Sequence, residues 1–243
     1  MTAASVLRAE RISVTFQGVK AVHDVSLQIA PDRITGLIGP NGAGKTTLLN
    51  VLSGNIKPHA GAIYWEGVEC SGETVYQRAR KGIARTFQIP RPLNNLTVEE
   101  NLAIASSFGC IRAAPDLSVE NVLVLLGLWE KRNLPAGNLN VAERKRLELG
   151  RALCTRPKVL LLDEVMAGLN PVELDRMIEL IRLIQQKGIG VLIIEHLMKV
   201  VMSLCNYLYV LDHGSLLAQG SPDEILKNES VVKAYLGERY MHG

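Results

Sequence analysis

The sequence predicts an α/β domain with a parallel-sheet core, preceded by an antiparallel β subdomain and carrying an inserted helical subdomain. Three observations support this fold class. The first thirty residues alternate apolar and polar side chains, continuous apolar segments occur near 34–38, 159–164 and 191–196, and helix signals dominate about 89–152. Alternation is typical of half-buried antiparallel strands, and continuous apolar runs are typical of parallel strands buried on both faces.

The first part of the chain is predicted to consist mainly of strands. VSLQI at 25–29 alternates, whereas ITGLI at 34–38 is almost continuously apolar and leads into a glycine-rich turn and a helix. AIYWEG at 62–67 and IARTFQ at 83–88 contain the β-branched and aromatic residues that favour strands. Beyond them, Leu96 precedes a capping box of Thr97 with Glu100, which marks the start of a helix.

The last third of the chain alternates strands and helices. VLLLDE at 159–164 and VLIIEH at 191–196 are predicted as buried strands, and Asn170-Pro171-Val172-Glu173 between them has the cap, proline and acid of a helix start. YLYVLDHGSLLAQG at 207–220 predicts a hairpin that turns at Asp212-His213-Gly214, and Ser221-Pro222-Asp223-Glu224 opens another helix.

A chain of 243 residues can bury a full core. We predict one domain over 1–243, with its core in 1–88 and 153–243 and the helical subdomain at about 89–152. The apolar content of 47% and charged content of 21% are those of a globular protein. The net charge of +3 is too small to indicate a nucleic-acid partner. We interpret the basic clusters at 144–146 and 78–81 as solvated helix faces.

Cysteine usage and the N-terminal sequence favour a cytoplasmic protein. The four cysteines, Cys70, Cys110, Cys154 and Cys205, show no CxxC spacing, and we interpret Cys154 and Cys205 as buried thiols in a reducing compartment. MTAASVLRAE has no apolar region of the kind that a secretory signal requires. The longest apolar runs, such as VLVLLGLW at 122–129, are much shorter than a membrane span. We therefore expect membrane association only through a partner.

A phosphate-binding loop follows the predicted strand at 34–38. Gly39-Pro40-Asn41-Gly42-Ala43-Gly44-Lys45-Thr46 fits the pattern G-x-x-x-x-G-K-[ST], and Thr47 continues it into a helix. Glycines let backbone N–H groups surround a phosphate, to which the helix N-terminus adds its positive dipole end. Lys45 is expected to reach the β- and γ-phosphates, and the Thr46 hydroxyl to ligate Mg²⁺.

An acid pair ends the predicted strand at 159–164. Asp163 is the candidate second ligand for Mg²⁺, because a P-loop site needs a further carboxylate for its metal ion. Glu164 faces the other side of the backbone, from where it can orient or deprotonate an attacking water. The alternative is a surface acid pair that merely closes a strand.

The phosphate loop and the acid pair, together with Gln88 and His196 after strands, form the pattern that ATP-binding cassette (ABC) ATPases show. The sequence resembles those ATPases over essentially the whole chain. The resemblance implies the α/β P-loop NTPase fold of those ATPases. It also implies that Gln88 reaches Mg²⁺ and the lytic water and that His196 touches the γ-phosphate. Taken alone, Gln88 is equally well a loop amide and His196 a strand-end histidine. Phe16 matches the family's adenine-stacking aromatic, with a plain core residue as the alternative.

Within the family, the sequence is similar to the ATPases of branched-chain amino acid importers. IARTFQIPRPLNNLTVEENL, MAGLNP and the C-terminal VVKAYLGE carry this similarity. Urea importers and the lipopolysaccharide-transport ATPase remain alternatives. The resemblance implies ATP and Mg²⁺ as ligands, ATP hydrolysis coupled to transport, and transmembrane permease subunits as partners at the cytoplasmic face of the inner or plasma membrane.

The family signature, usually Leu-Ser-Gly-Gly-Gln, corresponds here to Leu139-Asn140-Val141-Ala142-Glu143. In the family this stretch is presented to ATP held by a second ATPase subunit, so Asn140, Val141 and Ala142 become candidate nucleotide contacts. Asn140 and Glu143 still predict a capped helix start. The added side chains and the acid are expected to slow turnover, which favours pairing with a non-identical ATPase subunit. A nucleotide-binding regulatory subunit that hardly hydrolyses is the alternative.

Overall fold

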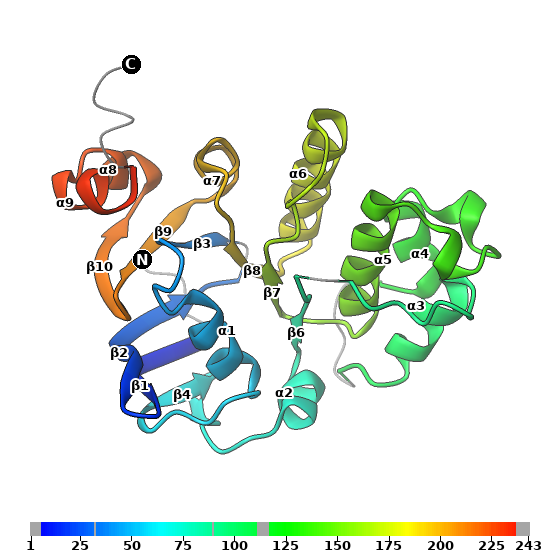
Figure 1. The fold of residues 1–243 in the computed structure, drawn as a ribbon. Helices are drawn as coiled ribbons and strands as arrows, with labels where there is room; N and C mark the ends of the chain where they lie inside the picture. Colours follow the sequence, from blue (N-terminus) through cyan, green and yellow to red (C-terminus); the bar gives the residue numbers. More distant parts are fainter. Residues whose placement is uncertain (1–5, 32, 89, 111–116, 237–243) are drawn as a thin grey trace.

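The computed structural model describes residues 6–31, 33–88, 90–110 and 117–236, and its ribbon divides into a sheet lobe and a helical lobe (Figure 1). The N-terminal strands form a four-stranded antiparallel sheet in the order β2-β1-β4-β5. Their bounds are Leu7–Phe16 for β1, Val19–Ile29 for β2, Ala60–Trp65 for β4 and Val68–Glu69 for β5. The predicted strand at 25–29 is confirmed, and it extends further toward the N-terminus.

A six-stranded sheet forms the centre of the molecule, in the order β10-β9-β3-β8-β7-β6. Its pairs are parallel except for the hairpin of β9 and β10 at one edge. The bounds are Ile34–Ile38 for β3, Ile83–Arg85 for β6, Val159–Asp163 for β7, Gly190–Ile194 for β8, Tyr207–Asp212 for β9 and Ser215–Gly220 for β10. The predicted parallel strands and the C-terminal hairpin are thus confirmed, but β6 ends three residues earlier than predicted.

Side chains of the central strands alternate between two apolar cores. On β7, Leu160 and Leu162 belong to the core shared with the helical lobe, whereas Val159 and Leu161 belong to the core that faces the antiparallel sheet. All five residues of β7 and all five of β8 are buried. The continuous apolar runs are therefore explained by burial on both faces of the sheet.

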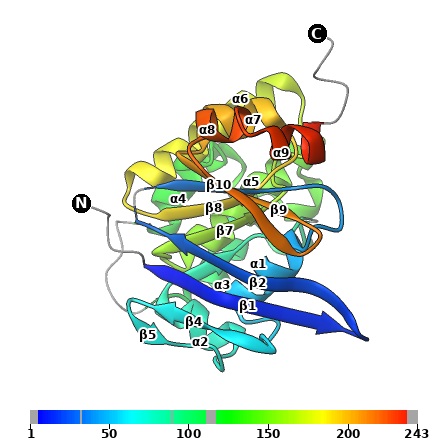
Figure 2. The ribbon, with the colours of Figure 1, turned by 90° about the vertical axis from the view of Figure 1, so that its left-hand side faces the viewer.

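Helix α1, Lys45–Ser53, lies between the two sheets, with contacts to β1, β2, β6 and β7 (Figure 2). The helical lobe contains α3, Val98–Ser106, α4, Val119–Leu125, and α5, Val141–Cys154, with short 3₁₀ turns at Trp129–Lys131 and Ala136–Asn138. The capping box of Thr97 and Glu100 is confirmed: Glu100 N donates to Thr97 Oγ1 at 3.1 Å, and Thr97 N donates to Glu100 Oε2 at 2.7 Å.

The remaining helices complete the outer layer above the central sheet in Figure 2. They are α6, Pro171–Gln186, α7, Met198–Leu204, α8, Pro222–Leu226, α9, Glu229–Val231, and a terminal π-helical turn, Val232–Leu236. Helices α6 and α8 both begin with the predicted cap and proline. In the part of the chain that the structure describes, no helix has both the length and the apolar character needed to cross a membrane.

The interpretation of the basic clusters as solvated faces is wrong at two residues. Arg78, on α2 (Val75–Lys81), is 1% exposed, and Lys145 on α5 is 7% exposed. Arg78 Nη1 donates to the carbonyls of Val51 and Leu52, and its Nη2 donates to that of Cys70. The charge is buried because the last carbonyls of α1 have no intrahelical donors and need a partner.

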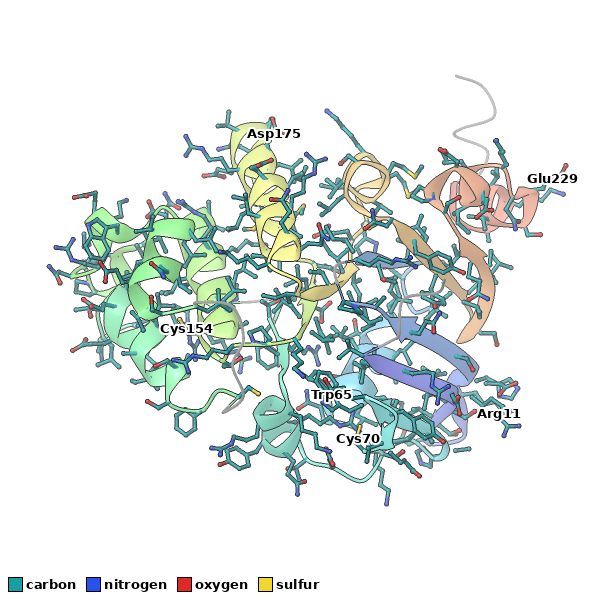
Figure 3. All side chains as sticks on the ribbon, turned by 180° about the vertical axis from the view of Figure 1, so that it is seen from behind. Arg11, Trp65, Cys70, Cys154, Asp175 and Glu229 are labelled. Carbon is teal, nitrogen blue, oxygen red and sulfur yellow. The ribbon has the colours of Figure 1, made fainter. Side chains whose placement is uncertain are left out.

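The four cysteines are buried and free. Figure 3 shows Cys154 with the helical lobe and Cys70 with the antiparallel sheet, so these two thiols belong to different lobes. Burial raises the pKa of both Cys154 and Cys205 to about 12. The prediction that Cys154 and Cys205 are buried thiols is therefore confirmed.

Candidate functional site: a nucleotide and metal site at the strand ends

The phosphate loop connects β3 to α1 in a conformation that requires glycine at two positions. Gly39 has φ +148°, and a Cβ there would lie 2.1 Å from the carbonyl oxygen of Leu211. Gly44 has φ +97°, and a Cβ there would lie 2.3 Å from the carbonyl oxygen of Ala21. Neither position has room for a side chain, so the loop is drawn tightly against β9 and β2 and its backbone is left open on the other side.

The N-terminus of α1 provides the donors for an anion. Gly44 is the N-cap residue, no side chain caps the helix, and its first turn contains no acid. The first N–H groups of such a helix lack intrahelical acceptors and attract phosphate. Lys45 Nζ donates to the carbonyls of Gly39 at 2.7 Å and Pro40 at 2.9 Å, which holds its charge over the loop. Burial lowers the pKa of Lys45, while Glu164 and Asp163 oppose that shift.

Asp163 and Glu164 stand at the end of β7, where the carboxyl ends of the parallel strands meet. Asp163 is 4% exposed, and its Oδ2 accepts from Arg85 Nη2 at 2.9 Å. Burial raises the pKa of Asp163, and the guanidinium of Arg85 opposes that rise. Glu164 has φ +49° and donates its backbone N–H to the carbonyl of Ile194 on β8 at 3.0 Å. This turn of the backbone separates the two carboxylates.

The structure brings Glu164, Gln88 and His196 together from three chain segments. Gln88 Nε2 donates to Glu164 Oε2 at 2.5 Å, and His196 Nε2 lies 2.7 Å from Glu164 Oε1. The two oxygens of Glu164 thus each have one partner, and the carboxylate is fixed at the mouth of the nucleotide cavity. Such an orientation suits a group that aligns a water for attack.

Two neighbouring cavities divide the site. One, of about 210 Å³, is lined by the phosphate loop with the acid and histidine beside it: Ala21, Asn41, Gly42, Ala43, Gly44, Lys45, Thr46, Thr47, Glu164 and His196. The other, of about 510 Å³, is lined by the three candidate metal residues Thr46, Gln88 and Asp163 together with Arg85, Phe87, Arg91, Glu148 and Arg151. Hydroxyl, amide and carboxylate oxygens are the donors that Mg²⁺ prefers. The residues present therefore fit a magnesium ion at this position.

Phe16 lies at the end of β1 with 47% of its surface exposed, so the alternative of a plain core residue is wrong. It is not among the described residues that line the phosphate-loop cavity. Its role in stacking on adenine stays a prediction.

The altered signature forms a regular helix start. Asn140 is the N-cap of α5, its Oδ1 accepts from Glu143 N at 2.9 Å, and Glu143 Oε2 accepts from Asn140 N at 3.1 Å. Glu143 Oε1 is also 2.5 Å from Lys131 Nζ. Burial alone would raise the pKa of Glu143, but the hydrogen bonds from Lys131 and Asn140 outweigh it and lower the pKa. The Glu143 side chain is thus turned inward, whereas Asn140 is exposed and Val141 is 62% exposed.

Several charged residues near the site had no predicted role there. Arg85, Arg91, Glu148 and Arg151 line the larger cavity. Lys145 Nζ donates to the carbonyl of Glu164 at 3.4 Å, and Glu195 Oε1 accepts from Met166 N at 2.9 Å. Glu195 is only 2% exposed, and burial raises its pKa. A signal was available for Glu195, which is an acid directly beside His196 at the end of a buried strand. For Arg85 and Lys145 the sequence shows only a charge.

The sequence matches known families over most of its length. Residues 22–167 match the model of the ABC transporter family, and residues 215–240 match that of the branched-chain amino acid ATP-binding cassette transporter. The branched-chain amino acid transport ATP-binding protein BraF of Pseudomonas aeruginosa is 38% identical, with 96% of this chain and 98% of BraF covered. The lipopolysaccharide export ATP-binding protein LptB of Acidithiobacillus ferridurans is 33% identical, with 97% and 98% covered.

The fold matches a solved structure as well. A crystal structure of an ATP-binding cassette of an ABC transporter in its ADP conformation superposes with a TM-score of 0.86 at 34% identity, covering 96% of this chain and 99% of that chain. The phosphate loop, the acid pair and the comparisons agree with one another. The chain belongs to the ATP-binding cassettes of ABC transporters, the ATPases that couple ATP hydrolysis to transport.

Proposed function

We propose that this ATPase powers the import of branched-chain amino acids or a similar small polar solute. The observation that carries the substrate class is the 38% identity to BraF over nearly the full length of both chains. The match of residues 215–240 to the branched-chain transporter model supports it independently of the nucleotide site. Lipopolysaccharide export is less favoured, because LptB is the more distant relative at 33% identity.

The geometry of the site supports the following chemistry. Lys45 and the N–H groups of the phosphate loop would bind the phosphates of ATP, and Thr46, Asp163 and Gln88 would hold Mg²⁺. When bound, the ion neutralises charge that develops on the transferred phosphoryl group. Glu164 orients the attacking water and accepts its proton, while His196 holds Glu164 and approaches the γ-phosphate.

The permease is proposed to dock in a groove between the central sheet and the helical lobe. A cavity of about 220 Å³ lies there, with Val75, Ala79, Phe87, Ala105 and Ala152 in its lining. Phe87 is 52% exposed and Val75 is 44% exposed, so apolar surface is available to a partner. The resemblance to ABC ATPases implies that the force-transmitting surface includes 89–95 and the helix from Thr97; Ile89 lies outside the described residues.

The groove and the nucleotide site are adjacent, since Phe87 precedes Gln88. ATP-driven closure of two ATPase subunits would therefore move the groove, and hydrolysis would release it. Through this contact the chain is held at the cytoplasmic face of the inner or plasma membrane.

The second ATPase subunit is proposed to be non-identical. In a homodimer both nucleotides would face Asn140, Val141 and Ala142, and the exposed Val141 side chain would stand where a glycine lets backbone approach phosphate. In a heterodimer the nucleotide bound here can face a signature with glycines. The contact of Glu164 with His196 supports a hydrolysing subunit over a regulatory subunit that hardly hydrolyses, because it orients the carboxylate that we propose for hydrolysis.

Reconstitution tests the proposed transport function. The chain is co-expressed with the permease and ATPase genes that neighbour it, and the complex is placed in proteoliposomes with its binding protein. We expect ATP-dependent accumulation of labelled leucine, isoleucine or valine, and no accumulation with the Lys45→Ala complex. Uptake of urea with no uptake of amino acids would contradict the proposed substrate class.

A further inference from the structure

Arg85 is buried beside the proposed metal carboxylate. It is the last residue of β6, the edge strand of the central sheet that runs next to β7 (Figure 1). Its Nη2 lies 2.9 Å from Oδ2 of Asp163, with the two side chains only 8% and 6% exposed. Hydrogen bonds between charged groups that water does not reach are short and directional. The guanidinium therefore fixes which way the carboxylate of Asp163 points.

The other side of the same guanidinium is anchored to α1. Arg85 Nη1 donates to Oδ1 of Asn50 at 2.5 Å and to Oγ of Ser53 at 3.3 Å. The ring of Phe87 covers the guanidinium, with 5.3 Å from Cζ of Arg85 to the ring centroid. Because α1 begins with Lys45, one side chain connects the helix that holds the phosphates to the acid that holds the metal ion.

A purely stabilising role does not explain this arrangement. Buried ion pairs contribute little to stability once desolvation is included, and an apolar replacement is often as stable. Arg85 Nε is in addition a buried donor without a hydrogen-bond partner among the described residues. Such an orphaned donor costs stability. The arrangement is better explained by its effect on Asp163, whose carboxylate it holds in one orientation.

We propose that Arg85 is a positioning residue for Mg²⁺ binding at Asp163. By holding Oδ2, it leaves Oδ1 as the free oxygen of Asp163, in the cavity that Thr46 and Gln88 also line. Arg85 itself is not a ligand, because a guanidinium has no lone pair to offer a cation. This inference rests on the proposed metal role of Asp163.

Calorimetric titration of the purified chain with ATP, once in EDTA and once in Mg²⁺, separates phosphate binding from metal binding. We expect Arg85→Met to retain the affinity measured in EDTA. The gain in affinity that Mg²⁺ gives the wild-type chain should fall by about tenfold, as for the loss of one charge-assisted hydrogen bond. Arg85→Lys keeps the positive charge, but it lacks the planar guanidinium whose two terminal nitrogens contact Asp163 and Asn50. It should recover only part of the gain.

Two further variants control for general effects of the substitution. Arg80→Met makes the same change on α2, where the guanidinium lies 6.0 Å from the ring of Tyr76 rather than beside an acid. It should keep the whole Mg²⁺-dependent gain. Asn50→Ala removes the shorter of the two contacts that Arg85 makes with α1, keeps the contact with Ser53, and leaves the pair with Asp163 intact. It should lose a smaller part of the gain than Arg85→Met, and it keeps the inference testable if Arg85→Met does not fold.

Arg85→Met with the full Mg²⁺-dependent gain would overturn the inference and leave the proposed function in place. An equal loss of affinity in EDTA and in Mg²⁺ would overturn it too, because the change would then act on the whole nucleotide site. A wild-type chain without any Mg²⁺-dependent gain would contradict the metal role of Asp163 together with the role of Arg85.

Discussion

His196 Nε2 lies 2.7 Å from Oε1 of Glu164, although 32 residues separate them in the chain. Gln88 holds the other oxygen of the same carboxylate at 2.5 Å. The three side chains come from the ends of β6, β7 and β8, which are adjacent in the central sheet. A single folded chain therefore already fixes the carboxylate that we propose to activate water, and in the proposed dimer closure has only to bring in the opposing signature.

Replacing Glu164 by Gln should stop hydrolysis after ATP has bound. Glutamine keeps the size and one acceptor oxygen, but it cannot accept a proton from water at neutral pH. We expect phosphate release to fall by a factor of about 10² to 10⁴, while a stable ATP-bound dimer accumulates. Size-exclusion chromatography with ATP and a phosphate-release assay measure the two effects. Normal phosphate release by Glu164→Gln would contradict the role of this carboxylate.

Reverting the signature should accelerate hydrolysis at the site it serves. In the triple variant Asn140→Ser, Val141→Gly and Ala142→Gly, backbone can approach the opposing phosphate. Recovering one or two charge-assisted hydrogen bonds of about 1.5–3 kcal/mol each should raise turnover by about one to several decades. Turnover is compared for the chain alone and for its complex with the neighbouring ATPase.

Asn140→Ser by itself is the control for this reversion. Serine is also a good N-cap, so helix stability should change by less than about 0.5 kcal/mol while access to the phosphate stays blocked by Val141. If the triple variant hydrolyses ATP at the wild-type rate in both preparations, the altered signature has no effect on catalysis.

Arg78→Met should destabilise the fold without touching nucleotide binding. The substitution removes the guanidinium donor from the carbonyl of Leu52 in a position that is 1% exposed, whereas the carbonyls of Val51 and Cys70 keep the backbone N–H groups of Gly54 and Glu73 as donors. A buried acceptor without a partner costs about 1–3 kcal/mol, so we expect a loss in that range. Denaturant titration measures it. Arg80→Met, two residues along the same helix, should change stability by less than about 0.5 kcal/mol; equal losses for both variants would refute the capping role.

Cys154 and Cys205 should resist alkylation in the folded protein. With the pKa of both thiols raised to about 12 by burial, the reactive thiolate at pH 8 is about one part in ten thousand. Raising the pH toward 12 favours the thiolate, but the side chains stay covered until the fold opens. Mass spectrometry after iodoacetamide treatment at pH 8 should show both sites unmodified when native and modified in denaturant. Rapid native labelling would contradict their burial.

The sequence predicts the strands that position the site because their apolar runs are continuous. β3, β7 and β8 need apolar side chains on both faces, and the polar residues that follow mark where each strand ends. For the segment at 83–88 the prediction was too long: pairing with β7 covers Ile83, Ala84 and Arg85 only. Thr86 still donates its N–H to the carbonyl of Leu161 on β7 at 2.9 Å, and beyond it the chain leaves the sheet and carries Gln88 toward Glu164.

The buried charges were not predictable from their own sequence segments. Arg78 and Lys145 lie on helices in runs of basic residues, which usually face water. Their burial depends on carbonyl groups that are distant in the chain, those of Val51 and Leu52 for Arg78 and that of Glu164 for Lys145. The pair of Arg85 with Asp163 likewise follows from the adjacency of β6 and β7, which is a property of the sheet order.

The most direct test of the central claim is the affinity of Lys45→Ala for Mg-ATP. Lys45 makes its hydrogen bonds to the phosphate loop itself, so the variant should fold, but it lacks the charge that we propose to contact the β- and γ-phosphates. We expect affinity to fall roughly tenfold to a hundredfold, whereas Lys57→Ala, an exposed lysine beyond the end of α1, should bind as the wild type does. Unchanged affinity in Lys45→Ala would contradict the assignment of this loop as the nucleotide site.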